Sequence, residues 1–305
     1  MPPRALPRAA AAAALVAALL PIAALAQTPK PGEVAASASL SGVHQFDTDL
    51  DHGGDFRWAA GIASGSVTRA FTPEFSARLA LRYDFEDWKF SHPVQFGGAE
   101  PWSHLNAPNI SVDLRYAVGS DLVIGVSPLF GWAFESGAKA SDALTYGAIF
   151  AATRVFTPSL TLGLGVGVIR QIDETKVFPF LIVDWKISDR WRLANPFPAG
   201  PAGGAGLELV YAPDDHWEFA GSGAYRSTRY RLDSAGAAPG GVGENRFSPL
   251  FARVARNFGA QTKVDLYAGV ALRGRLLVAD ASGATVARDD YSTAPLIGLT
   301  LAHRF

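Results

Sequence analysis

The sequence predicts an all-β protein: a single transmembrane, antiparallel, up-and-down β-barrel of about 14 strands, within a range of roughly 12 to 16, preceded by a cleaved signal peptide. Three observations predict this fold. The chain begins with an export signal, long segments alternate apolar and polar residues, and short turns alternate with long loops.

The composition narrows the class of protein before any motif is considered. Of the 305 residues, 49% are apolar, 18% are charged and none is cysteine. A disulfide scaffold, a cysteine-ligated metal site and a thiol enzyme are therefore excluded. The 27 Lys and Arg residues balance 28 Asp and Glu residues, so the net charge gives no indication of a nucleic-acid partner. The 31 glycines and 20 prolines indicate many turns.

The first 26 residues have the organisation of a secretory signal peptide. Arg4 and Arg8 precede an apolar run over residues 9–20, and residues 24–26 (Ala-Leu-Ala) offer the small-x-small cleavage pattern. A retained anchor helix is the alternative, but Pro21 ends the apolar run well short of the ~20 residues that span a bilayer. We therefore expect a signal peptide over residues 1–26 and an outer-membrane barrel over residues 27–305.

Alternation with period two predicts membrane-spanning strands in the mature chain. Successive strand residues point to opposite faces, and these runs put apolar residues on one face over roughly 9 to 14 positions, which suits a tilted membrane strand. A secreted β-sandwich is the alternative, but its strands are usually shorter and its wet face carries more Lys and Glu. The apolar positions are Phe75, Ala77, Leu79, Leu81, Tyr83 and Phe85; Ile110, Val112, Leu114 and Tyr116; Leu122, Ile124, Val126, Phe130, Trp132 and Phe134; Val264, Leu266, Ala268, Val270, Leu272 and Leu276; and Ile297, Leu299, Leu301 and Phe305.

The connections give a second estimate of the strand number. Short turns at 71–75, 118–121, 156–160, 187–191, 212–216 and 258–262 alternate with longer stretches at 47–55, 86–108, 135–142, 173–176, 195–203, 232–244 and 280–289. This order predicts an even strand number with both termini on the short-turn, periplasmic side. The weakest strand predictions are 34–46 and 191–211, where Pro196, Pro198 and Pro201 interrupt the second.

The end of the chain resembles a known assembly signal. A terminal Phe305 preceded by Leu301, Leu299 and Ile297 on one face is similar to the signal by which the barrel-assembly machinery recognises its substrates. His303 departs from that pattern, because an apolar residue is more usual there. The expected partners are outer-membrane lipid, periplasmic chaperones and this machinery, with no nucleic acid and an undetermined oligomeric state.

Several segments resemble an uncharacterised family of bacterial outer-membrane β-barrels, known as a domain of unknown function. They begin at Phe178 (FPFLIVDWK), Ser188 (SDRWRL), Gly243 (GENRF), Tyr267 (YAGVAL) and Asp289 (DDYSTAP), and the resemblance extends over most of the mature chain. It implies the fold and the location, and it brings no activity or catalytic residue.

The opposite strand faces define an expected lumen. Ten basic residues would face six acidic ones, which predicts a small-solute channel with a basic lumen that prefers anions. The alternative is a non-conducting structural barrel filled by cross-strand ion pairs. The expected lining residues are Arg78, Arg82, Asp84, Asp113, Arg115, Asp184, Lys186, Arg192, Glu208, Glu218, Arg226, Lys263, Asp265, Arg273, Arg275 and Arg304.

A glycine stripe and one long loop suggest that the lumen is partly occluded. Gly163, Gly165 and Gly167 face inward in succession, so that another segment can approach the barrel wall there, or else they are points of curvature. The best candidate for that segment is the 86–108 loop, whose Trp and Phe residues supply apolar anchors. A hydrophobic-solute transporter is a weaker alternative.

No motif predicts catalysis, a metal site or a cofactor. A lipid-modifying enzyme would need clustered Ser, His and acid residues, and the six histidines have no such spacing. His92 and His104 share a loop with acidic residues, but solvated side chains explain this better than a metal site. His52 lies in an acidic loop that lacks the closing glutamate of a calcium site. At His216, we expect the preceding carboxylates to bind backbone amides of a tight turn.

Overall fold

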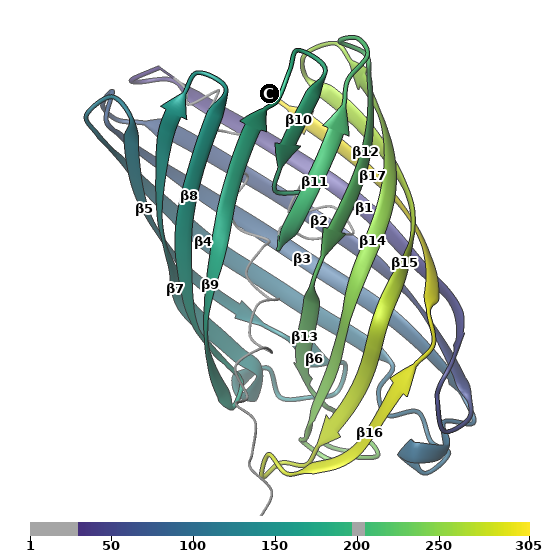
Figure 1. Cartoon of the computed structure of the whole chain (residues 1–305). Coiled ribbons are helices and arrows are strands. Elements are labelled where there is room, and N and C mark those ends of the chain that lie inside the picture. Colours follow the sequence, from purple (N-terminus) through teal and green to yellow (C-terminus); the bar gives the residue numbers. More distant parts are fainter. Residues whose placement is uncertain (1–29, 197–204) are drawn as a thin grey trace, which may run out of the picture.

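The computed structural model describes residues 30–196 and 205–305, which form one closed antiparallel β-sheet (Figure 1). The sheet closes because β1 pairs with both β2 and β17. In chain order, the strands are β1 (Val34–Asp49), β2 (Asp55–Ala70), β3 (Phe75–Ser91), β4 (His104–Val118), β5 (Leu122–Trp132), β6 (Phe134–Glu135), β7 (Leu144–Thr157), β8 (Leu160–Gln171), β9 (Glu174–Lys186), β10 (Trp191–Ala194), β11 (Gly206–Tyr211), β12 (Trp217–Ala224), β13 (Arg226–Arg231), β14 (Val242–Phe258), β15 (Thr262–Ala279), β16 (Thr285–Tyr291) and β17 (Ala294–Arg304).

These segments make a barrel of 14 strands, which confirms the predicted fold class. The pairs β5 and β6, β12 and β13, and β16 and β17 are each one strand with a short interruption. Two short 3-10 helices, Val94–Phe96 and Ala140–Ala143, lie in connections between strands. The expected signal peptide and the segment 197–204 lie outside the described residues. Within residues 30–196 and 205–305, no helix has the length and apolar character needed to cross a membrane.

The two faces of the barrel wall differ as the alternation predicts. On β17, the apolar side chains Ile297, Leu299 and Leu301 are exposed, whereas Thr300 between them is buried. On β3, Leu79 and Leu81 are exposed on the outside, and Arg82 points to the inside, where it is mostly covered. An exposed apolar outer face around a polar interior is the arrangement of a membrane-spanning β-barrel.

The six short turns are all present, but several long connections are shorter than expected. β3 continues to Ser91 and β4 begins at His104, so the predicted 86–108 loop shrinks to residues 92–103. The charged residues between 86 and 89 suggested a loop, yet Trp88 and Phe90 continue the inward face of β3. Val34 and Arg304, the outer ends of β1 and β17, both lie at the short-turn end (Figure 1).

A β-bulge in β15 changes which residues face inward. The register of β14 against β15 shifts where Arg246 of β14 lies opposite Arg275 and Ser248 lies opposite Leu272. Arg273 of β15, within this irregular stretch, has a positive φ of 54°. An extra residue at a bulge reverses the alternation beyond it. Leu276 is accordingly buried in the barrel, although simple alternation over residues 263–276 placed it on the outer face.

At the long-loop end, β13 leaves the wall and crosses the barrel. Its last residue, Arg231, pairs in parallel with Phe134 of β6 (Figure 1). In the order of strands around the sheet, β7 to β12 lie between β6 and β13. Both faces of β13 are covered, because Ser227, Arg229 and Tyr230 are all buried. We call β13 the septum. It lies between β1–β4 and β14–β17, where Tyr230 joins the hydrophobic core, and β7–β9, where Arg229 pairs with Asp173 and Glu174.

The hydrophobic core of the molecule lies on the β1–β4 and β14–β17 side of the septum. We call this cluster the aromatic core, because Phe, Trp and Tyr side chains fill most of it. None of its buried members comes from the described residues of β7, β8 or β9. The members are Val43, Leu50, Phe56, Trp58, Ala60, Trp88, Phe96, Trp102, Leu105, Ala133, Tyr230, Leu232, Phe247, Phe251, Tyr267, Ala271, Leu276, Val278, Tyr291, Ala294 and Leu296.

Candidate functional site in the barrel interior

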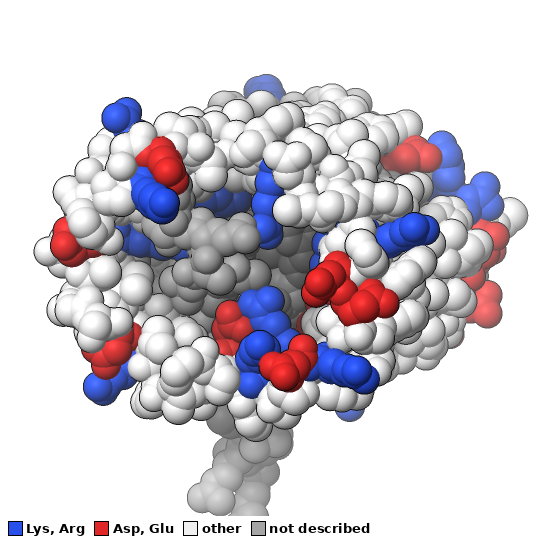
Figure 2. Space-filling model, turned by 90° about the horizontal axis from the view of Figure 1, so that it is seen from above, with Lys and Arg blue, Asp and Glu red and all other residues white. Residues whose placement is uncertain are grey.

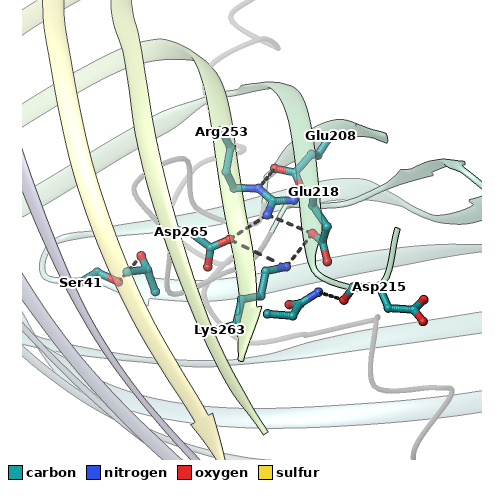
Figure 3. A network of polar contacts seen from close by, with 9 residues as sticks. Ser41, Glu208, Asp215, Glu218, Arg253, Lys263 and Asp265 are labelled. Carbon is teal, nitrogen blue, oxygen red and sulfur yellow. Dashed lines mark hydrogen bonds and ion pairs between the residues drawn. The ribbon is translucent and has the colours of Figure 1, made fainter. Parts of the chain in front are cut away.

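The short-turn half of the interior contains a network of charged residues on β11, β12, β14 and β15 (Figure 3). The Arg253 guanidinium donates to Glu208 at 2.7 and 3.1 Å, to Asp265 at 2.7 Å and to Glu218 at 3.1 Å. The Lys263 ammonium donates to Glu218 at 2.6 Å. Three carboxylates thus surround two cations. Such pairing makes burial of these charges tolerable, because a lone buried ion costs several kcal/mol.

Sequence analysis predicted four members of this network and missed its centre. Glu208, Glu218, Lys263 and Asp265 were expected to face the lumen, whereas Arg253 was not considered. The available signal was the alternation of Phe251, Arg253 and Ala255 with exposed residues along β14. Alternation within one strand shows that Arg253 faces inward, but it does not identify the carboxylates that face it.

Opposite charges also pair on β3 and β4, as sequence analysis suggested. Arg78 donates to Asp113 at 3.1 Å, and the buried Asp113 side chain also interacts with Arg115. Arg82 makes two bonds to Asp84, at 2.6 and 2.7 Å. The hydrogen bond to Asp113 comes from Arg78, whereas Arg115 follows two residues later on the same face of β4. Three cations, Arg78, Arg82 and Arg115, therefore face two carboxylates, which leaves this part of the interior with an excess of positive charge.

The remaining expected lining residues lie near the rims or outside the lumen. Arg192 pairs with Asp184 at 2.7 Å, and Lys186 with Asp189 at 3.3 Å near the short-turn rim. Arg304 ends β17 at the same rim, and Arg226 lies 3.9 Å from Glu86 at the edge of the aromatic core. Beyond the bulge, the exposed Arg273 and the pair Arg275–Asp290 lie on the face of β15 opposite to Leu276. This placement differs from the expected inward orientation of Arg273 and Arg275.

The described residues leave a hollow at the short-turn end (Figure 2). In the view from that end, both basic and acidic side chains surround this hollow (Figure 2). Because many of these side chains pair with each other, the lumen is less basic than the expected ratio of ten cations to six anions implied.

At the long-loop end, the side chains of the aromatic core fill much of the barrel's cross-section. Trp88 and Phe90 of β3 contact Trp102, with ring centroids 5.5 and 5.7 Å apart. Trp102 is 1% exposed and also approaches Gly243 on β14, where a Cβ would lie 2.9 Å from its ring. The 92–103 connection thus folds into the mouth through Trp102 and Phe96, which belong to the Trp and Phe anchors predicted for the 86–108 loop.

The glycine stripe of β8 does not receive this loop. A Cβ on Gly165 would collide with the ring of Phe180, and one on Gly167 would collide with the ring of Phe178. Both phenylalanines belong to the neighbouring strand β9 and lie directly opposite these glycines. The stripe therefore accommodates aromatic rings of the adjacent strand, an explanation that sequence analysis did not consider.

Polar contacts fasten the septum to the surrounding wall. Arg229 donates to Asp173 in the β8–β9 turn at 2.9 Å and to Glu174 at the start of β9. Arg231 donates to the carbonyl oxygens of Asp142 and Gly240. Glu135 of β6 accepts from the backbone amides of Ser103 and Asp233, each at 2.9 Å.

The histidines take part in local contacts at the ends of the barrel. His52 bonds to Asp289 at 2.7 Å, and this carboxylate raises the pKa of the His52 imidazole above its usual value. The Asp214 carboxylate accepts from the amides of His216 and Trp217, as predicted, and these bonds lower its pKa. His104 lies 3.0 Å from Asp87. Within the described ranges, no group of three His, Asp or Glu residues is placed to hold a metal ion.

Comparisons with known proteins give the fold and no name. No family model and no curated protein matches the sequence. Among solved structures, the chain is similar to an outer-membrane channel from Pseudomonas putida F1, with 9% identity, 91% of this chain and 97% of that chain covered, and a TM-score of 0.46. It is also similar to a mutant of the monoaromatic hydrocarbon channel TodX, with 12% identity, 93% of this chain and 94% of that chain covered, and a TM-score of 0.49. The KdgM porin is a third similar structure, with 8% identity, 86% of this chain and 97% of that chain covered, and a TM-score of 0.32.

These neighbours are all outer-membrane barrels. At such identities and TM-scores, the likenesses carry no argument about the solute of this chain. The resemblance noted in the sequence implied an outer-membrane barrel fold, and the closed sheet described above confirms that fold.

Proposed function

We propose that this protein is a small-solute channel of the bacterial outer membrane, entered through its wide short-turn end and constricted at its long-loop end by the aromatic core. The observation that supports it best is the hollow, charge-lined opening of the short-turn half (Figure 2). Water-filled barrels conduct solutes past such polar linings. The proposal includes outer-membrane lipid and the assembly machinery as partners. It includes no catalytic residue, metal or cofactor, and no nucleic acid.

The arrangement of charges supports a weak rather than a strong ion selectivity. On β3 and β4, cations outnumber carboxylates, whereas across the barrel three carboxylates surround Arg253 and Lys263. The fields of these two groups oppose each other. The channel should therefore prefer anions only slightly, and single charges should shift this preference measurably.

Reversal potentials in planar bilayers test this proposal. The wild-type protein in a salt gradient should show discrete conductance steps with a small anion preference, and Arg115→Gln should shift the reversal potential toward cations. Arg154→Gln is the matched control, because Arg154 is exposed and pairs with Asp121 near a short turn, away from the Asp113 group. An identical shift in both variants, or no shift in either, would contradict the proposed lining.

A non-conducting structural barrel is the second candidate. The aromatic core and the paired charges favour it, because both fill the interior with structure instead of leaving polar groups to solvent. A bilayer that stays silent with correctly folded wild-type protein, and also after the core has been opened by mutation, would support this candidate.

A further inference from the structure

The β7–β9 side of the septum contains buried polar groups without partners. Thr145 Oγ1, Gln171 Nε2 and Arg229 Nε are each buried and have no hydrogen-bond partner. Their residues are 3%, 1% and 8% exposed. A buried donor or acceptor without a partner costs about 1–3 kcal/mol, so three of them in one region require an explanation.

These groups converge on one place in the fold, the turn between β8 and β9. Thr145 of β7 lies directly opposite Gln171, the last residue of β8. Gln171 in turn pairs with Glu174, the first residue of β9, and Arg229 binds Asp173 and Glu174 from the septum. Ile172 at the turn has a positive φ of 58°, which is rare for a β-branched residue.

The charges around this turn balance each other. Arg229 pairs with Asp173 and Glu174, Arg246 lies 3.0 Å from Glu244, and Lys176 lies 3.9 Å from Glu174. Three cations thus meet three carboxylates. A charged ligand would disturb this balance, whereas a neutral acceptor oxygen would satisfy the unpartnered N–H groups of Gln171 and Arg229 and the hydroxyl of Thr145.

Apolar side chains lie on the same inner face, next to these polar groups. Ile149 follows Thr145 on β7, Ile169 precedes Gln171 on β8, and Phe178 follows Lys176 on β9. All three are buried, and none belongs to the aromatic core. A ligand that bound here would therefore have an apolar body beside a polar end.

We propose that the inner face of β7–β9, with Arg229 of the septum, binds a small neutral solute with an apolar body and a carbonyl oxygen. The carbonyl oxygen accepts from Gln171, Arg229 and Thr145, while Ile149, Ile169 and Phe178 contact the apolar part. This inference deepens the proposed channel function and rests on it in one respect, because it takes a solute of the interior as the ligand.

Ligand-observed saturation-transfer NMR on the folded, detergent-solubilised protein tests the proposal, with empty micelles subtracted. The probes are acetophenone, its counterpart ethylbenzene without the oxygen, and benzoate. Acetophenone should bind more tightly than both others. Each lost hydrogen bond should weaken its binding by about three- to tenfold in Gln171→Met and Thr145→Val, while ethylbenzene binding should not change.

Thr153→Val is the matched control, because Thr153 occupies the same face of β7 but its hydroxyl already donates to the Val123 carbonyl oxygen at 3.5 Å. Heat-modifiable migration on a detergent gel establishes that each variant is folded. Equal acetophenone binding in all variants, or binding no stronger than that of ethylbenzene, would overturn the proposal and assign the polar groups to bound water. Because no current is measured, this result is independent of whether the barrel conducts.

Discussion

At the scale of single residues, the environment of each charged group determines whether the barrel can bury it. Arg253 is only 5% exposed, and its burial is possible because each partner carboxylate has an oxygen within 3.1 Å of a guanidinium nitrogen. Removing one partner of a buried pair leaves an uncompensated charge, which is strongly destabilising. The interior charges are therefore part of the structure as well as candidates for solute contact.

The His52–Asp289 bond should make the stability of the long-loop end depend on pH. Because the pKa of folded His52 is raised, its contribution is fully present below the unfolded value of about 6.5 and is lost as the pH rises through the folded value. His52→Asn should lower the urea midpoint of unfolding at about pH 5.5 but have little effect at about pH 9. An equal change of the urea midpoint at both pH values would contradict this role of the His52–Asp289 bond.

Ile172 should be a position where substitution stabilises the protein. Its φ of 58° is unfavourable for a β-branched side chain, by about 1–2 kcal/mol, and Asn tolerates this conformation better. Ile172→Asn should raise the free energy of unfolding in urea by about 1 kcal/mol. Ile187→Asn is the control, because Ile187 also precedes a turn but has no positive φ. A loss of stability at Ile172 would show that its side-chain contacts outweigh the strain.

The sequence predicts individual inward residues where the alternation is unbroken. It predicted the inward Arg78, Arg82 and Asp113 because β3 and β4 follow strict alternation. It did not predict the orientation of Arg273 and Arg275, because an extra residue at a bulge leaves no clear mark in a local pattern. It also did not predict the unpartnered polar groups at the β8–β9 turn, which become visible only when separate strands are placed together.

At the scale of elements, strand number and turn positions were predictable, whereas the course of β13 was not. The six short turns follow from Gly, Pro and Asp residues at fixed places. The segment Arg226–Arg231 carries polar residues on both faces, with Tyr230 as its one aromatic residue. This local pattern does not reveal that both faces are covered inside the barrel. Only the pairing of Arg231 with Phe134, which are distant in sequence, identifies it as a septum.

The close packing of β8 against the Phe rings of β9 should make the glycine stripe intolerant of larger residues. Gly165→Ala would place a methyl group in the ring of Phe180, so the strand or the ring must shift. We expect a loss of about 1–3 kcal/mol in the free energy of unfolding, because overpacking has costs of this size. Gly221→Ala on β12 is the control, since no atom lies within 4 Å of its added Cβ.

A second Gly165 variant separates steric overlap from backbone effects. Adding Phe180→Leu to Gly165→Ala should restore part of the lost stability if the ring causes the overlap. Equal stability losses in Gly165→Ala and Gly221→Ala would instead indicate that the glycines provide curvature only.

The last strand should carry the assembly signal predicted from the sequence. Phe305 is exposed and its amide donates to the Ala36 carbonyl oxygen at 2.9 Å, so the terminal residue lies at the seam between β17 and β1. Deleting Phe305 should reduce the yield of folded barrel in outer-membrane fractions far more than Ala302→Ser on the inward face. We choose Ala302 rather than Thr300 on the same inward face, because the Thr300 hydroxyl bonds to the Ser41 hydroxyl at 2.7 Å inside the barrel. Equal yields would place the signal elsewhere.

At the scale of the whole molecule, the barrel has two unlike ends. The short-turn end is hollow and bordered by charged residues, whereas Trp88, Trp102 and the other residues of the aromatic core fill much of the long-loop end (Figures 1 and 2). The septum separates that core from the inner face of β7–β9.

We expect the long-loop end to limit passage through the barrel, because the aromatic core fills much of it. Single-channel conductance of the wild-type protein and of Trp102→Ala, both shown to be folded by gel migration, measures this restriction. We expect small discrete steps for the wild type and larger steps for Trp102→Ala, because this change opens the aromatic core beside Trp88 and Gly243. Wild-type steps that do not change in Trp102→Ala, or the absence of steps in both proteins, would contradict this expectation.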